Sequence, residues 1–178
     1  MTSAGRAAEN GPALALTLQR GARIAAWPVA AARLRRWVRI ALSRDATIVL
    51  RLVARAEAEA LNVSFRGREY APNVLTFAYG QPARGRNLEA DVVICVPVVR
   101  AEARAQRKPF DHHLAHMVVH GVLHAQGHDH VEPGEAAEME ALETRLLARL
   151  RIPDPYAAPA DRARAPARSA HDRPRTRV

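Results

Sequence analysis

The stretch HGVLHAQGHDH, which runs from His120 to His130, is the feature that most constrains the fold of this chain. Residues four apart lie on one face of a helix, so His120 and His124 can point their imidazoles at one ion. His130 lies about a turn and a half beyond His124 and would face another side of a continuous helix. Gly127 can adopt the left-handed conformation that ends a helix and turns the chain back. The spacing therefore predicts a metal site formed by a helix and the turn after it.

Three neutral imidazoles on one divalent ion leave a tetrahedral position open to water, which is the arrangement of catalytic zinc sites. An ion held in this way lowers the pKa of its water and polarises a carbonyl or phosphoryl oxygen. We expect one Zn²⁺ per chain on His120, His124 and His130, although three imidazoles also suit other divalent transition metals.

His128 is the alternative third ligand, because it lies four residues beyond His124 and would share its face on an unbroken helix. Gly127 favours an end to the helix, and therefore His130.

Other polar residues surround the motif. One turn before His120, His116 is expected to be a core residue or to support a ligand, whereas His112 and His113 are expected at the surface of the helix start. Asp129 could orient a ligand imidazole or take part in acid–base chemistry, and the first use is the commoner one.

Gly121 separates this motif from that of the metzincin proteases, which share the histidine spacing. Those enzymes have a glutamate base directly after the first histidine, and this chain has Gly121 there. Peptide hydrolysis by the usual route is therefore disfavoured. Phosphodiester cleavage asks less of a protein base but requires cations that hold the phosphate.

Arg66 and Arg68 are candidates for that role. They occur in the segment NVSFRGREYAPNVLTF, where residues 63–70 are expected to form a polar loop beside aromatic residues. Charge combined with aromatic stacking is how proteins hold single-stranded nucleic acid. An isolated arginine pair is more often an ordinary surface feature, so Arg66 is a candidate phosphate contact.

Hydrophobic periodicity predicts one α+β domain with a small mixed sheet packed against helices. Pro97 is expected to end the last strand, and Asp111 to cap the helix that carries the histidines. The expected strands span 13–19, 46–53, 73–79 and 90–98, and the expected helices span 28–42, 54–62, 98–107, 111–126 and 133–150.

Composition adds limits on partners and location. The 178 residues suit one domain, expected over 13–156, with a flexible leader over 1–12 and a disordered Arg/Pro/Ala-rich tail over 157–178. The formal net charge of +9 favours an anionic partner, and nucleic acid first.

Cys95 is expected to be a buried hydrophobe with no disulfide partner. We expect a cytoplasmic protein without a membrane partner.

Four segments together resemble the YbeY endoribonuclease family, the bacterial rRNA maturation factors: LNVSFRGREYAPNVLTF, DVVICVPVVRAEARAQ, HHLAHMVVHGVLHAQGHDH and EMEALETRLLARLRIPDPY. The resemblance implies that His120, His124 and His130 bind zinc and that Arg66 is associated with activity. It implies a single-strand-specific, metal-dependent endoribonuclease that acts in rRNA maturation, including the small-subunit rRNA 3′ end, and in ribosome quality control. Its partners would be single-stranded RNA or rRNA and the ribosome or its small subunit.

Three positions depart from the family pattern: Pro72, Ala90 and His128. Two alternatives stay open at this point. One is a non-catalytic RNA-binding ribosome-assembly factor with a structural metal, and the other, disfavoured by Gly121, is a metalloprotease.

Overall fold

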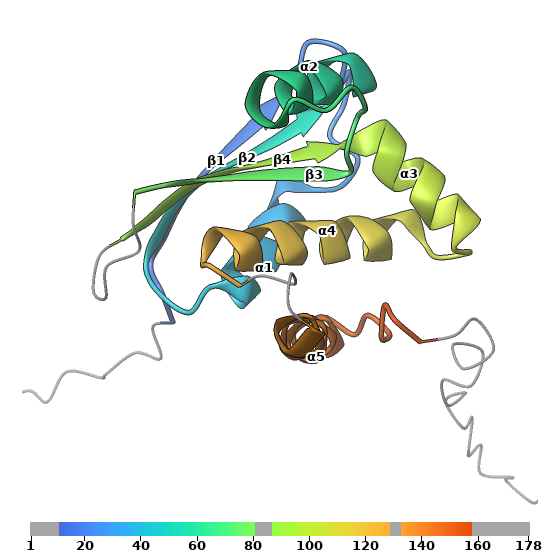
Figure 1. Cartoon of the computed structure of the whole chain (residues 1–178). Coiled ribbons are helices and arrows are strands. Elements are labelled where there is room, and N and C mark those ends of the chain that lie inside the picture. The colour runs from blue at the N-terminus through green and yellow to red at the C-terminus, as the bar shows by residue number, and fades with distance from the viewer. Residues whose placement is uncertain (1–10, 81–86, 129–132, 158–178) are drawn as a thin grey trace, which may run out of the picture.

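The computed structural model describes residues 11–80, 87–128 and 133–157 (Figure 1). Strands and helices alternate along most of the chain and end in three successive helices. The elements are β1 (Leu14–Arg20), α1 (Ala31–Ala41), β2 (Ala46–Val53), α2 (Arg55–Arg66), β3 (Val74–Tyr79), β4 (Leu88–Cys95), α3 (Val96–Ala105), α4 (Phe110–Ala125) and α5 (Pro133–Arg149).

The strands form one four-stranded sheet in the order β1-β2-β4-β3. β1, β2 and β4 run parallel, whereas β3 pairs antiparallel with β4 at the edge of the sheet. The predicted α+β domain with a small mixed sheet is therefore confirmed.

Helices cover both faces of the sheet, with α1, α4 and α5 on one side and α2 on the other (Figure 1). β4 contributes side chains to the packing on both faces of the sheet, because successive side chains of a strand point to opposite faces. Val92 and Ile94 belong to the main core under α4, and Val93 and Cys95 belong to a smaller core under α2. Cys95 is buried as predicted, and burial raises the pKa of its thiol.

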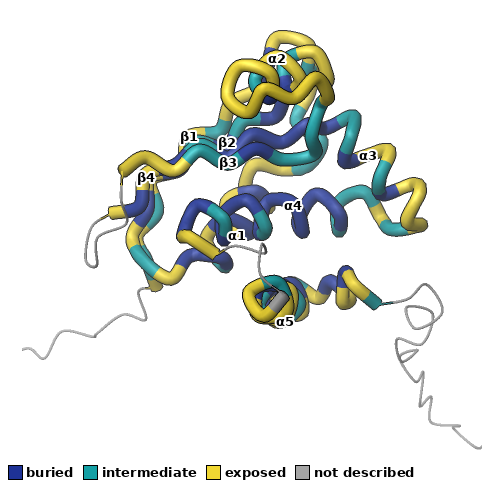
Figure 2. Tube along the Cα trace, viewed as in Figure 1, coloured by how far each residue is buried: buried dark blue, intermediate teal, exposed yellow. Residues whose placement is uncertain are grey.

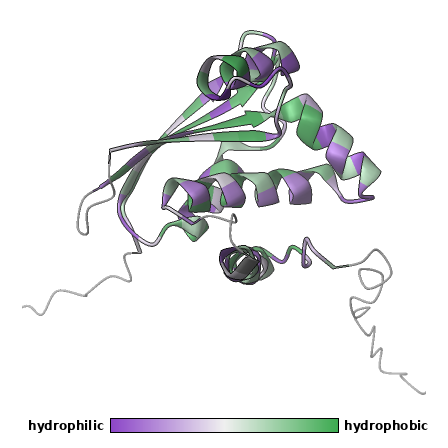
Figure 3. Cartoon of the chain, viewed as in Figure 1, coloured by the Kyte–Doolittle hydropathy of each residue, from purple (hydrophilic) through white to green (hydrophobic). Residues whose placement is uncertain are grey.

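α4 is the central helix, in contact with α1, α3, α5 and the strands β3 and β4. Most of its residues are buried, which appears as a dark blue stretch in Figure 2. Hydrophilic segments interrupt the hydrophobic ones along α4 in Figure 3, because histidines recur through its sequence. A helix enclosed in this way can hold polar side chains in fixed positions.

Several element boundaries differ from the prediction. α2 continues four residues beyond Asn62 to Arg66 and ends where Gly67 adopts a left-handed φ of 65°. The amide of Asn62, instead of ending the helix, is buried and donates to the carbonyl oxygen of Tyr70 at 2.9 Å. Pro97 lies in the first turn of α3, where its missing N–H is tolerated, and the strand ends before it.

The predicted cap of α4 is also wrong. The N-cap is Pro109, and no side chain caps this end. The carboxylate of Asp111 instead accepts a hydrogen bond from Arg33 at 2.8 Å, which ties α4 to α1. Residues 1–10 and 158–178, which include most of the expected leader and tail, lie outside the described residues. Among the helices that are described, none has the length and apolar character needed to cross a membrane.

Candidate metal centre and adjoining cleft

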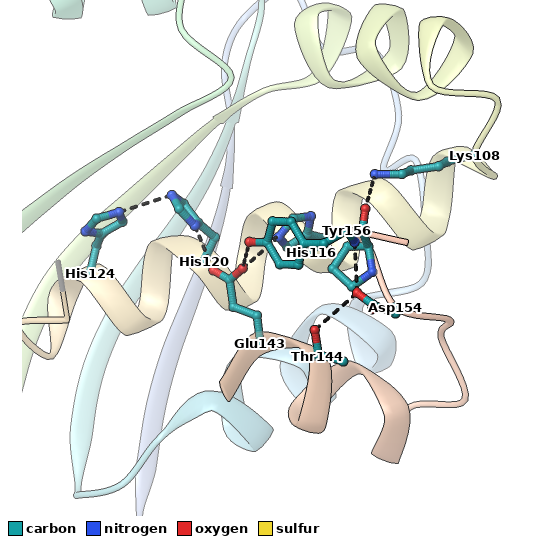
Figure 4. Close-up of polar contacts among 9 residues, drawn as sticks. Lys108, His116, His120, His124, Glu143, Thr144, Asp154 and Tyr156 are labelled. Carbon is teal, nitrogen blue, oxygen red and sulfur yellow. Dashed lines mark hydrogen bonds and ion pairs between the residues drawn. The ribbon is translucent and has the colours of Figure 1, made fainter. Parts of the chain in front are cut away.

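His120 and His124 are brought together on α4, as their spacing predicts (Figure 4). Their Nε2 atoms are 3.1 Å apart. Two imidazoles bound to one tetrahedral zinc ion, each at 2.0–2.1 Å, would place these nitrogens about 3.3 Å apart. The two side chains therefore already have nearly the separation that shared coordination requires.

Glu143, on α5, is the hub of the polar side chains around His120 (Figure 4). Its carboxylate is fully buried, with Oε1 2.7 Å from Nδ1 of His120 and Oε2 2.9 Å from Nε2 of His116. The hydroxyl of Tyr156 donates to the same Oε2. Burial alone would raise the pKa of Glu143, but the hydrogen bonds from His116, His120 and Tyr156 lower it to about 2. Glu143 is thus a buried carboxylate whose charge is balanced by donors.

The same hydrogen bonds act on Tyr156 in the opposite direction. Burial, followed by the bond to Glu143, raises the pKa of the Tyr156 phenol well above its ordinary value. This residue therefore stays a neutral donor to the carboxylate.

His116, His120 and Glu143 form a group able to hold a metal ion, since their ligand atoms lie within 4.8 Å of one another. The two ring nitrogens of His120 nonetheless differ in their surroundings. Nδ1 meets the carboxylate of Glu143, and Nε2 faces His124. Metal-binding histidines commonly donate one ring N–H to a carboxylate while the other nitrogen binds the ion.

The end of α4 explains how the chain turns away after His124. Gly127 has a φ of 90°. Its N–H donates to the carbonyl oxygen of His124 at 3.0 Å, and the N–H of His128 donates to that of Leu123 at 3.2 Å. These two bonds make a Schellman motif, in which a left-handed residue ends the helix. The predicted turn at Gly127 is confirmed.

This turn removes the geometry that would have favoured His128 as a ligand. His128 lies beyond the helix end and is exposed, so it does not continue the face of His124. His130 and Asp129 lie outside the described residues.

Close packing against the sheet explains the glycine at position 121, and the sequence alone did not show this. A Cβ at this position would lie 2.6 Å from Cγ1 of Val92 and 3.1 Å from Cγ2 of Val74, both on the sheet. The hydroxyl of Thr76 also donates to the carbonyl oxygen of Gly121 at 3.1 Å. Position 121 therefore faces the sheet at close range, and a glutamate there would not fit.

A cleft of about 460 Å³ adjoins the two histidines. Arg66 and Tyr70 line it together with His120 and His124, although Arg66 comes from the last turn of α2 instead of the predicted loop. None of the described residues lining it is acidic. Arg68 does not line the cleft, and its guanidinium lies 3.5 Å from the hydroxyl of Tyr70. Arg66, His120 and His124 therefore line the same cleft.

Sequence reasoning missed Glu143, and a usable signal was present. Met139, Leu146 and Leu147 are buried on α5, and Glu143 lies on the same stripe. A carboxylate at a core position of an amphipathic helix needs buried donors, and histidines on the preceding helix could have supplied them.

The prediction for His113 was wrong, because this side chain is buried instead of exposed. Its Nε2 lies 2.8 Å from Oε2 of Glu102, which also accepts from the amide of Asn73 at 3.2 Å. His116 is buried and bonded to Glu143, which confirms a core or supporting position.

Comparisons with known proteins give one consistent description. A family model described as "Endoribonuclease YbeY" matches residues 28–151. Curated proteins with the same description include one from Aromatoleum aromaticum, 53% identical over 81% of this chain and 93% of the relative. A second, from Thiobacillus denitrificans, is 55% identical over 70% of this chain and 84% of the relative. A third, from Bordetella pertussis, is 50% identical over 82% of this chain and 97% of the relative.

Among solved structures, the solution structure of TM1509 from Thermotoga maritima has a TM-score of 0.48 at 21% identity. It covers 76% of this chain and 91% of that chain.

Proposed function

Because the chain belongs to the YbeY endoribonuclease family, we propose that it is a metal-dependent endoribonuclease that cleaves single-stranded RNA. The observation that carries the proposal is one cleft lined by Arg66, Tyr70, His120 and His124. Its substrate is ribosomal RNA that is being matured, including the 3′ end of the small-subunit rRNA. It acts on the ribosome or the small subunit in the cytoplasm.

The metal is one Zn²⁺ bound by His120, His124 and His130. The 3.1 Å separation of the Nε2 atoms of His120 and His124 supports this ligand set. The contact from Glu143 to Nδ1 of His120 supports it further, because Nε2 would then be the ring nitrogen that binds the ion. When bound, the ion would polarise a phosphoryl oxygen and lower the pKa of a water molecule. Glu143 in this arrangement orients the His120 ring and is not itself a ligand.

Arg66 and Tyr70 supply the contacts to RNA. Arg66 places a cation on the cleft wall, where it can hold a phosphate and offset charge that develops on it during cleavage. The side chain of Tyr70 is 51% exposed and can stack on an unpaired base. A base inside a duplex is already stacked and cannot use this surface, which accounts for single-strand preference.

The test compares His124→Ala with His112→Ala. Both remove a histidine from α4, but His112 does not line the cleft. With a single-stranded ribosomal RNA substrate, His124→Ala and metal-stripped wild type should lose cleavage, while His112→Ala and zinc-restored wild type keep it. Undiminished cleavage by folded His124→Ala that contains no metal would overturn the proposal. Purification of all samples by one protocol controls for contaminating ribonuclease.

The same variants separate this enzyme from an assembly factor with a structural metal. An enzyme predicts that His124→Ala stays folded and binds RNA without cutting it. If metal removal instead unfolds the protein, and RNA binding is lost along with the fold, the structural-metal alternative gains.

A further inference from the structure

Four arginines converge on a groove that is separate from the cleft. Arg35, Arg36 and Arg39 come from α1, and Arg149 comes from the end of α5. The groove encloses about 570 Å³, and Ile40 and Leu42 are among its other lining residues. We call it the arginine groove. Its cations thus come from two helices far apart in sequence.

The four guanidiniums are not neutralised within the described part of the chain. None of them has a carboxylate partner there, whereas Arg33 pairs with Asp111 and Arg51 with Glu57. No acidic residue is among the described residues that line the groove. α1 itself contains no acidic residue. The groove is therefore a concentration of positive charge.

The spacing on α1 makes this concentration unfavourable for the isolated fold. Arg35 and Arg39 are four residues apart, and Arg36 and Arg39 are three apart, so like charges are neighbours on the helix surface. Such pairs destabilise a helix by a few tenths of a kcal/mol each. A bound polyanion would offset this repulsion, because its negative charges attract each arginine.

The chemistry of the groove favours a phosphate backbone. Guanidinium groups bind phosphate oxygens in a bidentate manner, and successive cations along a helix can meet successive phosphates. The partly buried Ile40 and the buried Leu42 also line the groove, so apolar side chains lie among its cations. A regular row of phosphates matches this row of cations better than the scattered carboxylates of a protein surface.

Of the residues that the structure describes, none lines both the arginine groove and the cleft. The cleft lies between α2, β3 and α4, at the β3 edge of the sheet, whereas the groove lies on α1, which packs against α4 and contacts β1. We propose that the arginine groove binds the phosphate backbone of RNA outside the segment that is cut, and so anchors long RNA while one strand occupies the cleft. The inference rests on the proposed function for the position of the cut.

The experiment measures RNA binding separately from cleavage. In the full-length chain carrying His124→Ala, the triple change Arg35→Gln, Arg36→Gln and Arg39→Gln is tested against a labelled tetranucleotide and a long single-stranded RNA. Affinity for the long RNA should fall by roughly tenfold, and the slope of log affinity against log salt should drop by about 2, as expected for three lost phosphate contacts. Affinity for the tetranucleotide should stay unchanged relative to His124→Ala alone, because the triple change alters no residue that lines the cleft.

A matched control removes the same charge elsewhere. Arg23, Arg55 and Arg104 are exposed arginines without a carboxylate partner in the described residues. Their triple change to glutamine should weaken binding of the long RNA much less. A triple change of the groove arginines to lysine should keep most of the salt slope.

Equal losses in the groove and control variants, or no loss in the groove variant, would overturn the inference. An acidic protein as the true occupant predicts that second result. Circular dichroism shows whether each variant is folded. Because the assay does not require cutting, a wild-type chain that binds through the groove but cleaves no RNA would contradict the proposed function alone.

Discussion

At the scale of single residues, Glu143 does most to orient the histidines of α4. One buried carboxylate contacts both His116 and His120 and accepts a hydrogen bond from Tyr156. Replacing it with the neutral Glu143→Gln keeps the size of the side chain but removes the charge that favours donation by Nδ1 of His120. We expect zinc affinity to fall 10- to 100-fold, as is typical when a carboxylate behind a metal-binding histidine is lost. Competition with a chelator of known affinity measures this change.

Glu102→Gln is the matched control for that experiment. Glu102 also bonds to a buried histidine of α4, but that histidine is His113, which does not line the cleft. This variant should lower stability and leave zinc affinity within about twofold of wild type. Equal loss of zinc affinity in both variants would show that Glu143 acts through general stability and not through His120.

Gly121 allows a second prediction at this scale. In Gly121→Ala, the added methyl group would meet Val92 and Val74 on the sheet at distances that require movement. We expect the free energy of unfolding to decrease by about 1–3 kcal/mol, the usual range for overpacking a core. Denaturant unfolding measures it, with Gly134→Ala as the control because no atom of the described residues lies within 4 Å of a Cβ there. An unchanged free energy of unfolding in Gly121→Ala would show that α4 can shift freely away from the sheet.

At the scale of elements, the turn that ends α4 allows a test of the predicted third ligand, His130. The φ of 90° at Gly127 lies in the left-handed region, which disfavours residues with a Cβ. Gly127→Ala should reduce stability by about 1–2 kcal/mol, and Gly127→Asn by less, since asparagine tolerates this region. If His130 is the third ligand, zinc affinity should fall in the same order. Calorimetry and chelator competition on both variants check this, and an unchanged affinity would argue against His130.

The burial of His113 on α4 gives a pH dependence. Burial lowers the pKa of His113 below its usual 6.5, although Glu102 partly opposes the shift. Its neutral form is therefore favoured by folding, and this contribution to stability is complete above pH 6.5 and is lost as the pH falls through the lower folded pKa. The free energy of unfolding should decrease less on acidification in His113→Gln than in wild type. Urea titrations at several pH values measure the two slopes, and identical slopes would contradict the prediction.

Elements and ligands differ in how far the sequence predicts them. The strand at β2 and the helix spacing of His120 and His124 follow from local periodicity and are confirmed. The role of Glu143 depends on how α5 docks onto α4, and burial of His113 depends on α3. Such contacts join segments that only the tertiary fold brings together, so a local pattern cannot assign them. The end of α2 was misjudged for the same reason, since Asn62 bonds to Tyr70 across a turn.

At the scale of the whole molecule, both hydrophobic cores are built from residues between Leu14 and Ile152. The expected domain of residues 13–156 stays a prediction, and a chain limited to residues 11–157 tests it. This shortened chain should keep the thermal midpoint of the full chain within a few degrees, because no residue of the described cores is removed. Its RNA affinity should depend less on salt, since the segment after residue 157 contributes six arginines and two aspartates. A large fall in the thermal midpoint would show that the terminal segments belong to the fold.

The position of Glu143 on α5, the last helix described, bears on the order in which the enzyme matures. Synthesis delivers α2, β3 and α4 before α5, so the cleft and its histidines emerge from the ribosome while the carboxylate that orients His120 is still absent. Until α5 is added, the chain lacks the carboxylate that contacts Nδ1 of His120. The surroundings of His120 are therefore complete only once the last described helix has been made and has packed on α4.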